Sequence, residues 1–285
     1  MKYSELFKKA VTELSAAGNE APEYEARELM YHFLGTDRMF LIDRAEDNVP
    51  EEKEILFMDA VEKRKTGFPL QYILGSWSFM ETELSVGEGV LIPRDDTEVC
   101  VRECMELLDR TGIAAPVILE LCSGSGAISL ALAKQYPFAR ITALELSEKA
   151  YGYLCRNIRG NNADENVKPV RADVFTAYVD FPDHSFDVLI SNPPYIRTDE
   201  IPTLQKEVGF EPQMALDGGS DGLDFYRCIA EKWLKKLKSG GIISLEIGEQ
   251  QGRDVTGLLL HNAAENVRVI KDIAGLDRTV SGFIR

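Results

Sequence analysis

The chain has 285 residues, 45% of them apolar and 28% charged, which are ordinary values for a globular protein. It carries 47 acidic against 32 basic residues, a net charge of -15. This balance argues against a duplex DNA substrate, because proteins that bind DNA neutralise phosphates with lysine and arginine. No apolar run approaches the length of a membrane-spanning helix and no signal-peptide pattern opens the chain, so we expect no membrane partner.

Residues 1–75 predict a small helical domain. Apolar residues recur at helical spacing from Leu6 to Leu14, Gly18 can end that helix, and Pro22 opens the next. Two further helices are expected over about 36–45 and 50–65. After them, aromatic and β-branched residues from 71 to 92, punctuated by glycines, predict a short hairpin or linker, which we place at 76–94.

Residues 95–285 alternate between strands and helices, a pattern typical of a doubly wound, mostly parallel sheet. The expected strands cover 117–121, 140–145, 167–171, 186–191, 242–247, 267–273 and 279–285. The expected helices cover 127–135, 148–159, about 222–238 and about 250–262. We therefore expect an α/β domain that follows the helical one in the chain.

Five cysteines are present: Cys100, Cys104, Cys122, Cys155 and Cys228. An odd count without CxxC spacing argues against a disulfide framework and against a zinc site, so we expect no metal. Free thiols fit a reducing compartment, and we expect a cytoplasmic protein. The oligomeric state stays open, with a monomer favoured.

A glycine-rich turn follows the first strand of the alternating region, in Glu120-Leu121-Cys122-Ser123-Gly124-Ser125-Gly126. Gly124 and Gly126 let the backbone pass close to a ligand, and the helix start offers unpaired N–H groups. The dinucleotide pattern GxGxxG is absent, because Ser129 stands where a third glycine would be. A mononucleoside is therefore favoured over a nicotinamide cofactor.

Acidic residues at or near the ends of three strands define that ligand further. Glu120 places a carboxylate beside it, which suits a cation better than a pyrophosphate. Glu145 ends the next strand and can accept hydrogen bonds from both ribose hydroxyls, and Asp173 can meet an adenine amine. These features favour S-adenosylmethionine, which has a sulfonium and an ammonium and no phosphate.

The segment Asn192-Pro193-Pro194-Tyr195 directly follows the apolar run 186–191. Two prolines cannot continue a central strand, so we expect a stiff loop at the carboxyl edge of the sheet, where ligands bind. Such a loop suits an enzyme that holds a planar NH2 group, either a base or an amide.

An amide nitrogen is a poor nucleophile because its lone pair is delocalised, and acceptors placed for its two N–H groups help it to pyramidalise toward a methyl donor. The side-chain carbonyl of Asn192 and the peptide carbonyl of Pro193 can be these acceptors, while Tyr195 can pack on the planar group and exclude water. The expected catalytic residues are Asn192, Pro193 and Tyr195, and Pro194 joins them as substrate-binding. The expected cofactor-binding residues are Glu120, Cys122, Gly124, Gly126, Glu145, Asp173 and Asn192.

Several separate motifs resemble one family. They are 71–75, 90–98, 120–126, 192–195, 211–219 and 271–278. With them the chain resembles the HemK/PrmC family, the glutamine-N5 methyltransferases that modify peptide chain release factors. The Asn-Pro-Pro-Tyr loop alone is shared with DNA adenine-N6 methyltransferases, whereas Ile92-Pro93-Arg94 and the Glu211-to-Gly219 motif are similar to the glutamine enzymes.

The resemblance implies a class I methyltransferase domain that uses S-adenosylmethionine and yields S-adenosylhomocysteine. It also implies a helical domain that helps hold a release factor, whose Gly-Gly-Gln glutamine would be methylated in translation termination. Asn192 and Pro193 would bind the glutamine amide, and Tyr195 would line its pocket. The chain departs from the family at Asp95, usually proline, at Cys122, usually glycine, and at Glu145, more often aspartate.

Two alternatives stay open. One is a related enzyme that acts on a ribosomal-protein glutamine. The other is a non-catalytic module that binds a translation factor through its helices and retains a vestigial methyltransferase fold. An intact Asn-Pro-Pro-Tyr segment beside an intact glycine turn argues against such decay.

Overall fold

The structure is a computed structural model that describes residues 1–285, and internal contacts divide it into two compact units. The first unit comprises Met1–Ser76 and Gln205–Phe210, and the second comprises Trp77–Leu204 and Glu211–Arg285. The domain boundaries proposed above, 1–75, 76–94 and 95–285, stay a prediction. By contacts, the stretch expected as a linker belongs to the second unit from Trp77 onward. None of the helices has the length and apolar character needed to cross a membrane.

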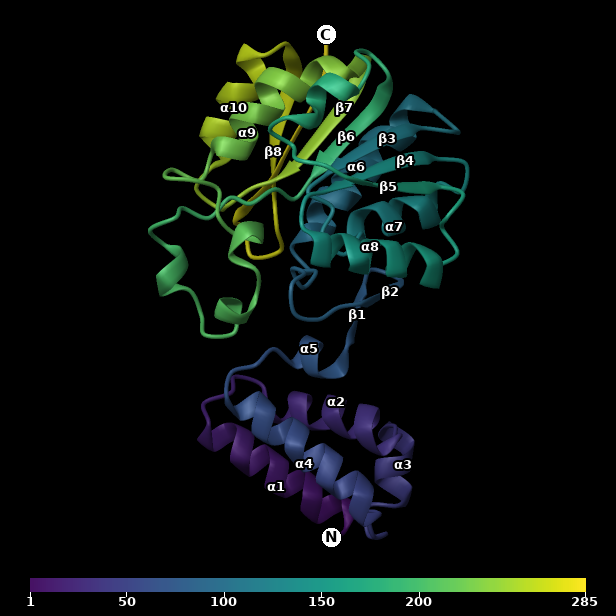
Figure 1. The fold of residues 1–285 in the computed structure, drawn as a ribbon, viewed down its shortest axis with the longest axis vertical. Helices are drawn as coiled ribbons and strands as arrows, with labels where there is room; N and C mark the ends of the chain where they lie inside the picture. The colour runs from purple at the N-terminus through teal and green to yellow at the C-terminus, as the bar shows by residue number, and fades with distance from the viewer. The chain divides into compact units, whose positions relative to one another are not determined.

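The first unit is a bundle of helices, drawn in purple to blue in Figure 1. The helices are α1 (Tyr3–Ala16), α2 (Pro22–Leu34), α3 (Arg38–Asp43), α4 (Glu51–Lys65) and α5 (Leu70–Leu74). Leu6, Leu29 and Phe57 meet in its core, fully buried. The helix α5 corrects the expectation of extended chain from residue 71: Pro69 precedes its first turn, and Gly75 ends it in the left-handed region at φ 73°.

The segment Gln205–Phe210 joins this bundle from a distant part of the chain. The guanidinium of Arg64, 3% exposed, donates to Glu25 at 2.8 Å and also pairs with Glu207. The ring of Phe210 packs edge-on against Phe68, with centroids 5.3 Å apart. No pattern in the sequence predicts this arrangement, because the partners are far apart along the chain.

The second unit contains a hairpin of β1 (Ser76–Phe79) and β2 (Thr82–Ser85) and a seven-stranded sheet, so the predicted fold class is confirmed. The sheet strands are β3 (Val117–Leu121), β4 (Arg140–Glu145), β5 (Val167–Arg171), β6 (Phe186–Ser191), β7 (Leu237–Glu246), β8 (Ala264–Lys271) and β9 (Asp277–Ile284). Their order is β5-β4-β3-β6-β7-β9-β8, and only β9 pairs antiparallel, with β7 and β8. The carboxyl ends of β4, β3, β6 and β7 therefore lie along one edge.

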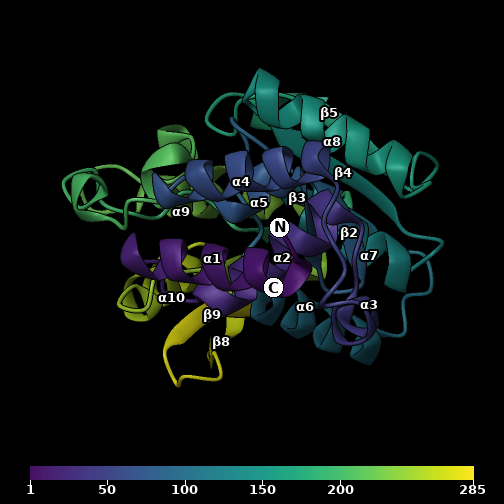
Figure 2. The ribbon, with the colours of Figure 1, turned by 90° about the horizontal axis from the view of Figure 1, so that it is seen from below.

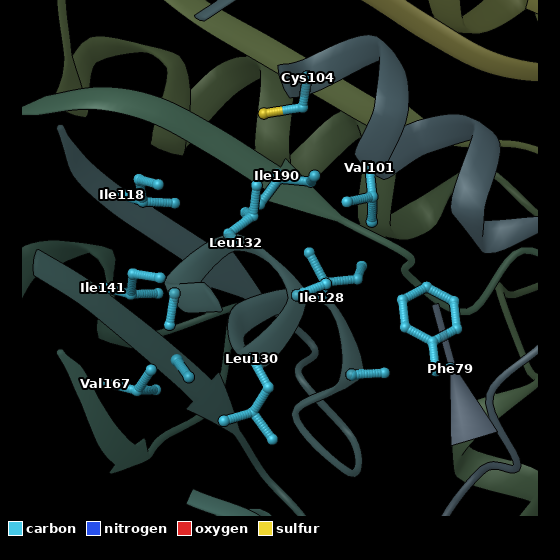
Figure 3. Packing of buried hydrophobic residues seen from close by; sticks show 14 of the residues in the cluster. Phe79, Val101, Cys104, Ile118, Ile128, Leu130, Leu132, Ile141, Val167 and Ile190 are labelled. Atoms are coloured by element: carbon cyan, nitrogen blue, oxygen red, sulfur yellow. The ribbon is translucent and has the colours of Figure 1, made fainter. Parts of the chain in front are cut away.

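Helices cover both faces of this sheet (Figures 1 and 2). They are α6 (Thr97–Thr111), α7 (Ala127–Gln135), α8 (Glu148–Gly160), α9 (Asp224–Cys228) and α10 (Gly252–His261). Successive strand residues point to opposite faces, so Ile118 packs with α6, α7 and α8 while Leu119 packs with α9 and α10. Figure 3 shows the first of these cores, where strand residues such as Ile141 and Ile190 face Ile128 and Leu132 of α7.

The expected helix over 222–238 is a further correction. The helix α9 covers only Asp224–Cys228 and is continued by a π turn, Ile229–Trp233, and a 3₁₀ turn, Leu234–Lys236. Strand β7 begins at Leu237, five residues before the expected start at 242, because Leu237 pairs with Phe186 across an irregularity in the ladder. Gly240, at φ 75°, lets the strand continue through that irregularity.

Candidate functional site

A cavity of about 310 Å³ opens at the carboxyl ends of the central strands. This volume lies in the range of about 300–1,000 Å³ that is usual for small-molecule sites. Six of the predicted site residues line it: Cys122, Gly124, Glu145, Asp173, Asn192 and Pro194. Four others do not belong to its wall: Glu120, Gly126, Pro193 and Tyr195.

Glu145, at the end of β4, is held in the wall by backbone donors. Its Oε2 accepts a hydrogen bond from the N–H of Gly124 at 2.8 Å, and its Oε1 accepts one from the N–H of Ser147 at 2.7 Å. Burial raises the pKa of this carboxyl, and the backbone N–H groups of Ser147, Gly124 and Leu146 oppose that rise. A carboxylate has about four lone-pair positions, so two acceptors remain for a pair of ribose hydroxyls.

The glycine-rich turn presents open backbone to the cavity. Gly124 has φ 53°, and a Cβ placed there would meet nothing within 4 Å, so free space borders it. Gly126 has φ 85°, and a Cβ there would come within 2.6 Å of Leu154 Cδ1 on α8, so this glycine serves packing beneath the turn. Gly124 thus leaves space for a ligand, whereas Gly126 allows α8 to pack closely against the turn.

Cys122 also has a left-handed backbone, at φ 58°. This conformation is uncommon for a residue with a side chain and is cheap only for glycine. It therefore explains physically why a glycine is usual at this position in the family that the sequence resembles. The thiol lies in the cavity wall, and burial raises its pKa, so it stays protonated and uncharged.

Glu120 lies beneath the turn and not on the cavity wall. It is 1% exposed, and its Oε2 accepts hydrogen bonds from the backbone N–H of Ser129, at 3.0 Å, and from the Ser129 hydroxyl. Burial raises the pKa of Glu120 to about 8. Its observed partners are thus in the first turns of α7, and it holds the glycine turn against that helix. Contact with a ligand stays a prediction for this residue.

Asp173 and its neighbours Val174 and Phe175 line the wall after β5. The Asp173 carboxylate accepts a hydrogen bond from the N–H of Phe175 at 2.8 Å, which shapes a tight turn. A carboxylate and an aromatic side chain thus line the same part of the cavity, a combination suited to an adenine base with its exocyclic amine.

Asn192 reaches the cavity from the end of β6. Its side-chain Nδ2 donates to the Thr97 hydroxyl at 3.1 Å, and Thr97 is the first residue of α6. This bond leaves the side-chain carbonyl of Asn192 available as an acceptor in the cavity wall.

Tyr195 turns away from the cavity toward the end of β7. Its hydroxyl donates to Glu246 Oε1 at 3.3 Å, and it lines a second cavity of about 420 Å³ with Arg197, Gly248 and Arg278 among others. Burial and the nearby carboxylate raise the pKa of Tyr195 well above its usual range. Packing of this ring on a substrate amide stays a prediction.

The 211–219 segment braces the Asn-Pro-Pro-Tyr loop. The Glu211 carboxylate pairs with Arg94 and accepts the N–H of Ile92 at 2.9 Å, joining two motifs that are far apart in the chain. Gly218 crosses the loop so closely that a Cβ would lie 2.7 Å from Tyr195 Cα. The N–H of Gly218 donates to the carbonyl of Ile196 at 2.8 Å. Only a residue without a side chain fits at this crossing.

Comparisons with known proteins agree with this site. Residues 5–75 match the family model of the PrmC N-terminal domain, and residues 118–209 match a methyltransferase domain. A release factor glutamine methyltransferase of Thermodesulfovibrio yellowstonii is 40% identical over 260 residues, 90% of each chain. The chain belongs to the release factor glutamine methyltransferase family. A second relative with that name, from Clostridium acetobutylicum, is 35% identical over 281 residues, 98% of each chain.

Solved structures agree on the fold. The catalytic domain of hMettl16, in complex with MAT2A 3'UTR hairpin 1, has a TM-score of 0.57 and 13% identity, covering 92% of this chain and 90% of that one. The family and the methyltransferase fold identify an enzyme whose methyl donor is S-adenosylmethionine. The resemblance to the HemK/PrmC family is thereby confirmed.

Two residues of the site escaped prediction, Thr97 and Glu246. Glu246 ends a buried strand with a carboxylate, the same signal that marked Glu120 and Glu145 in the sequence. Thr97 lies within the motif 90–98, but nothing local connects it with Asn192, 95 positions away.

Proposed function

We propose that this chain transfers a methyl group to the side-chain amide nitrogen, N5, of the glutamine in the Gly-Gly-Gln motif of a peptide chain release factor. The observation that carries the proposal is that Asn192, whose side-chain Nδ2 donates to Thr97, lines the same cavity as Glu145 and Gly124. The names of the relatives support the release factor as substrate and glutamine as the modified residue.

The cavity fits S-adenosylmethionine. Glu145 has two lone-pair positions left for ribose hydroxyls, Gly124 offers open backbone, and Asp173 with Phe175 suits the adenine. The cofactor, when bound, supplies an electrophilic methyl on a sulfonium. Glu145, Gly124, Cys122, Asp173 and Asn192 are the residues that would hold it.

The residues of the loop prepare the nucleophile. The Asn192 side-chain carbonyl and the Pro193 peptide carbonyl accept the two N–H groups of the glutamine amide, so the nitrogen lone pair turns toward the methyl donor. The prolines restrain the peptide acceptor, because their φ is fixed by the ring, and the hydrogen bond to Thr97 restrains the side chain of Asn192. Pro194 adds an apolar wall, and Tyr195 is held on the other side of the loop.

The nitrogen can release its proton after it has gained the methyl group, so no strongly basic side chain is needed in the wall. The cavity fits this requirement, because its three acidic members, Glu145, Asp173 and Asp217, are already engaged by backbone N–H groups.

The experiment is incubation of the chain with purified release factor and methyl-labelled cofactor, followed by mass analysis of the tryptic peptides. We expect one methyl group on the Gly-Gly-Gln glutamine, and a release factor with that glutamine changed to asparagine should take up none. Label on a ribosomal protein instead would favour the first alternative. Failure to bind cofactor in calorimetry would favour the non-catalytic module.

The proposal extends to the setting of the reaction. A monomer acting in the cytoplasm on a protein substrate, without DNA, is consistent with the net charge of -15 and five free cysteines. Light scattering of the purified chain at micromolar concentration tests the oligomeric state.

A further inference from the structure

Glu246 is a buried carboxylate behind the Asn-Pro-Pro-Tyr loop. It ends β7, is 1% exposed, and is not part of the wall of the 310 Å³ cavity. Its Oε1 accepts the hydroxyl proton of Tyr195, while its Oε2 is buried with no hydrogen-bond partner. An isolated buried carboxylate oxygen is costly, so its retention needs a reason.

Thr97 connects this carboxylate with the proposed catalytic amide. Its hydroxyl oxygen accepts the N–H of Asn192 at 3.1 Å, so its own proton is available for another acceptor. The same hydroxyl lies close enough to Glu246 to lower the pKa of that carboxyl. A chain of polar groups therefore runs from Glu246 through Thr97 to Asn192, and a branch runs to Tyr195.

We propose that Glu246 is a positioning residue for amide methylation, whose carboxylate takes the protons of Thr97 and Tyr195 and so directs Asn192 Oδ1 toward the substrate. This inference rests on the proposed function and adds a residue that the sequence did not reveal. With Glu246 ionised, every donor in the chain points toward it, and the amide has one favoured orientation. With Glu246 protonated, its O–H becomes a donor, the Thr97 proton can turn to Asn192, and the reversed amide competes.

The surroundings of Glu246 allow this change near neutral pH. The pKa of Glu246 is raised to about 7, mainly by burial and in smaller part by Asp96, while Thr97, Arg278 and Tyr195 oppose the rise. Two other titratable groups face it: Tyr226, whose hydroxyl donates to the Glu246 backbone carbonyl at 2.8 Å, and Cys100 on α6. Arg278 is itself held by Asp272 at 3.2 Å and Asp96 at 3.3 Å, so it stays in place as the nearby positive charge.

The test compares Glu246→Gln with the wild type between pH 6 and pH 8.5. We expect kcat to fall by about tenfold to a hundredfold at pH 8, since a small misplacement of a reacting group costs that much. Cofactor affinity, measured by calorimetry, should be unchanged. The wild-type kcat should fall as pH drops through about 7, where Glu246 gains its proton, and the variant should lack this acid limb. Glu265→Gln, an exposed glutamate on β8, is the control for loss of one negative charge.

Thr97 variants test the same connection between Glu246 and Asn192 if the Glu246→Gln protein does not fold. Thr97→Val should reproduce the loss, Thr97→Ser should retain wild-type kcat and pH profile, and the double variant Glu246→Gln/Thr97→Val should be no worse than either alone. Equal kcat in Thr97→Val and Thr97→Ser would overturn the proposal.

A readout without substrate separates this inference from the proposed function. The side-chain NH2 resonances of Asn192 in the ¹⁵N spectrum of the wild type should shift with a midpoint near pH 7, and Thr97→Val should abolish that shift. A wild type that leaves the release factor unlabelled would overturn the proposed function. Asn192 resonances that do not respond to pH would overturn the role of Glu246.

Discussion

Two buried carboxylates end strands of the same sheet, and their partners differ in origin. Glu145, at the end of β4, is held by the backbone N–H groups of Gly124 and Ser147, both close to strand ends. Glu246, at the end of β7, meets side chains from three distant segments, and one of its oxygens has no partner. We call the part of the site around Glu145 the cofactor half and the part around Asn192 and Glu246 the transfer half. The cofactor half is thus held by local backbone groups, and the transfer half by side chains from distant segments.

This difference has a functional consequence. Backbone donors cannot titrate or rotate away, so the position of the Glu145 carboxyl does not depend on the protonation of neighbouring side chains. The transfer half depends on hydroxyls and a carboxyl whose protons can be rearranged, so its geometry can be lost without loss of cofactor binding. Variants that separate kcat from cofactor affinity test the comparison directly.

Asn192→Ala should have the largest effect, because it removes an acceptor that acts on the reacting amide. We expect kcat to fall roughly 100-fold or more, the usual cost of deleting one preorganised polar group at a reaction centre. Cofactor affinity in calorimetry should stay within about twofold, which would show that the variant impairs methyl transfer and not cofactor binding. Unchanged turnover would refute the role of Asn192.

Glu145→Gln should weaken cofactor binding by about tenfold, since a charge-assisted acceptor is replaced by a neutral one. At saturating cofactor, kcat should be retained. The matched control is Glu148→Gln, in the first turn of α8, whose side chain is 81% exposed in a pair with Arg171. A fall in kcat without a change in cofactor affinity would mean that the two halves are not separable as described.

Gly218→Ala should damage the transfer half through packing alone. The new methyl group would lie 2.7 Å from Tyr195 Cα and 2.8 Å from the Pro194 carbonyl oxygen. We expect a loss of about 1–3 kcal/mol in the free energy of unfolding and a fall in kcat. The control is Gly257→Ala on α10, where nothing lies within 4 Å, and a gain of about 0.5–1 kcal/mol is expected. Urea unfolding measures both, and equal effects would refute the argument.

Cys122→Gly should have the smallest effect. Glycine relieves the left-handed backbone at φ 58° but loses the buried thiol contacts and gains freedom in the unfolded chain. We expect a change within about 1 kcal/mol in the free energy of unfolding. Cys122→Val should cost about 1–3 kcal/mol, because a β-branched side chain tolerates this conformation poorly. A valine variant as stable as the glycine variant would show that the turn can relax.

The sequence by itself determined most of the methyltransferase sheet, since the strands 117–121, 140–145, 167–171 and 186–191 and the helix 127–135 were predicted with the bounds observed. It also identified the cavity residues Gly124, Glu145, Asp173 and Asn192, because each lies at the carboxyl end of a strand or within three residues after it, and parallel strands bring these ends together. These features depend on local periodicity and on strand ends, which the order of residues encodes.

Only the tertiary structure decided the rest. The orientation of Glu120 toward Ser129, the turn of Tyr195 toward Glu246, and the bond between Thr97 and Asn192 depend on packing between segments far apart in the chain. The addition of 205–210 to the helical unit and the early start of β7 have the same origin. The reason is physical: side-chain direction and strand register are set by burial against partners that are distant in the sequence, and a local pattern does not indicate these partners.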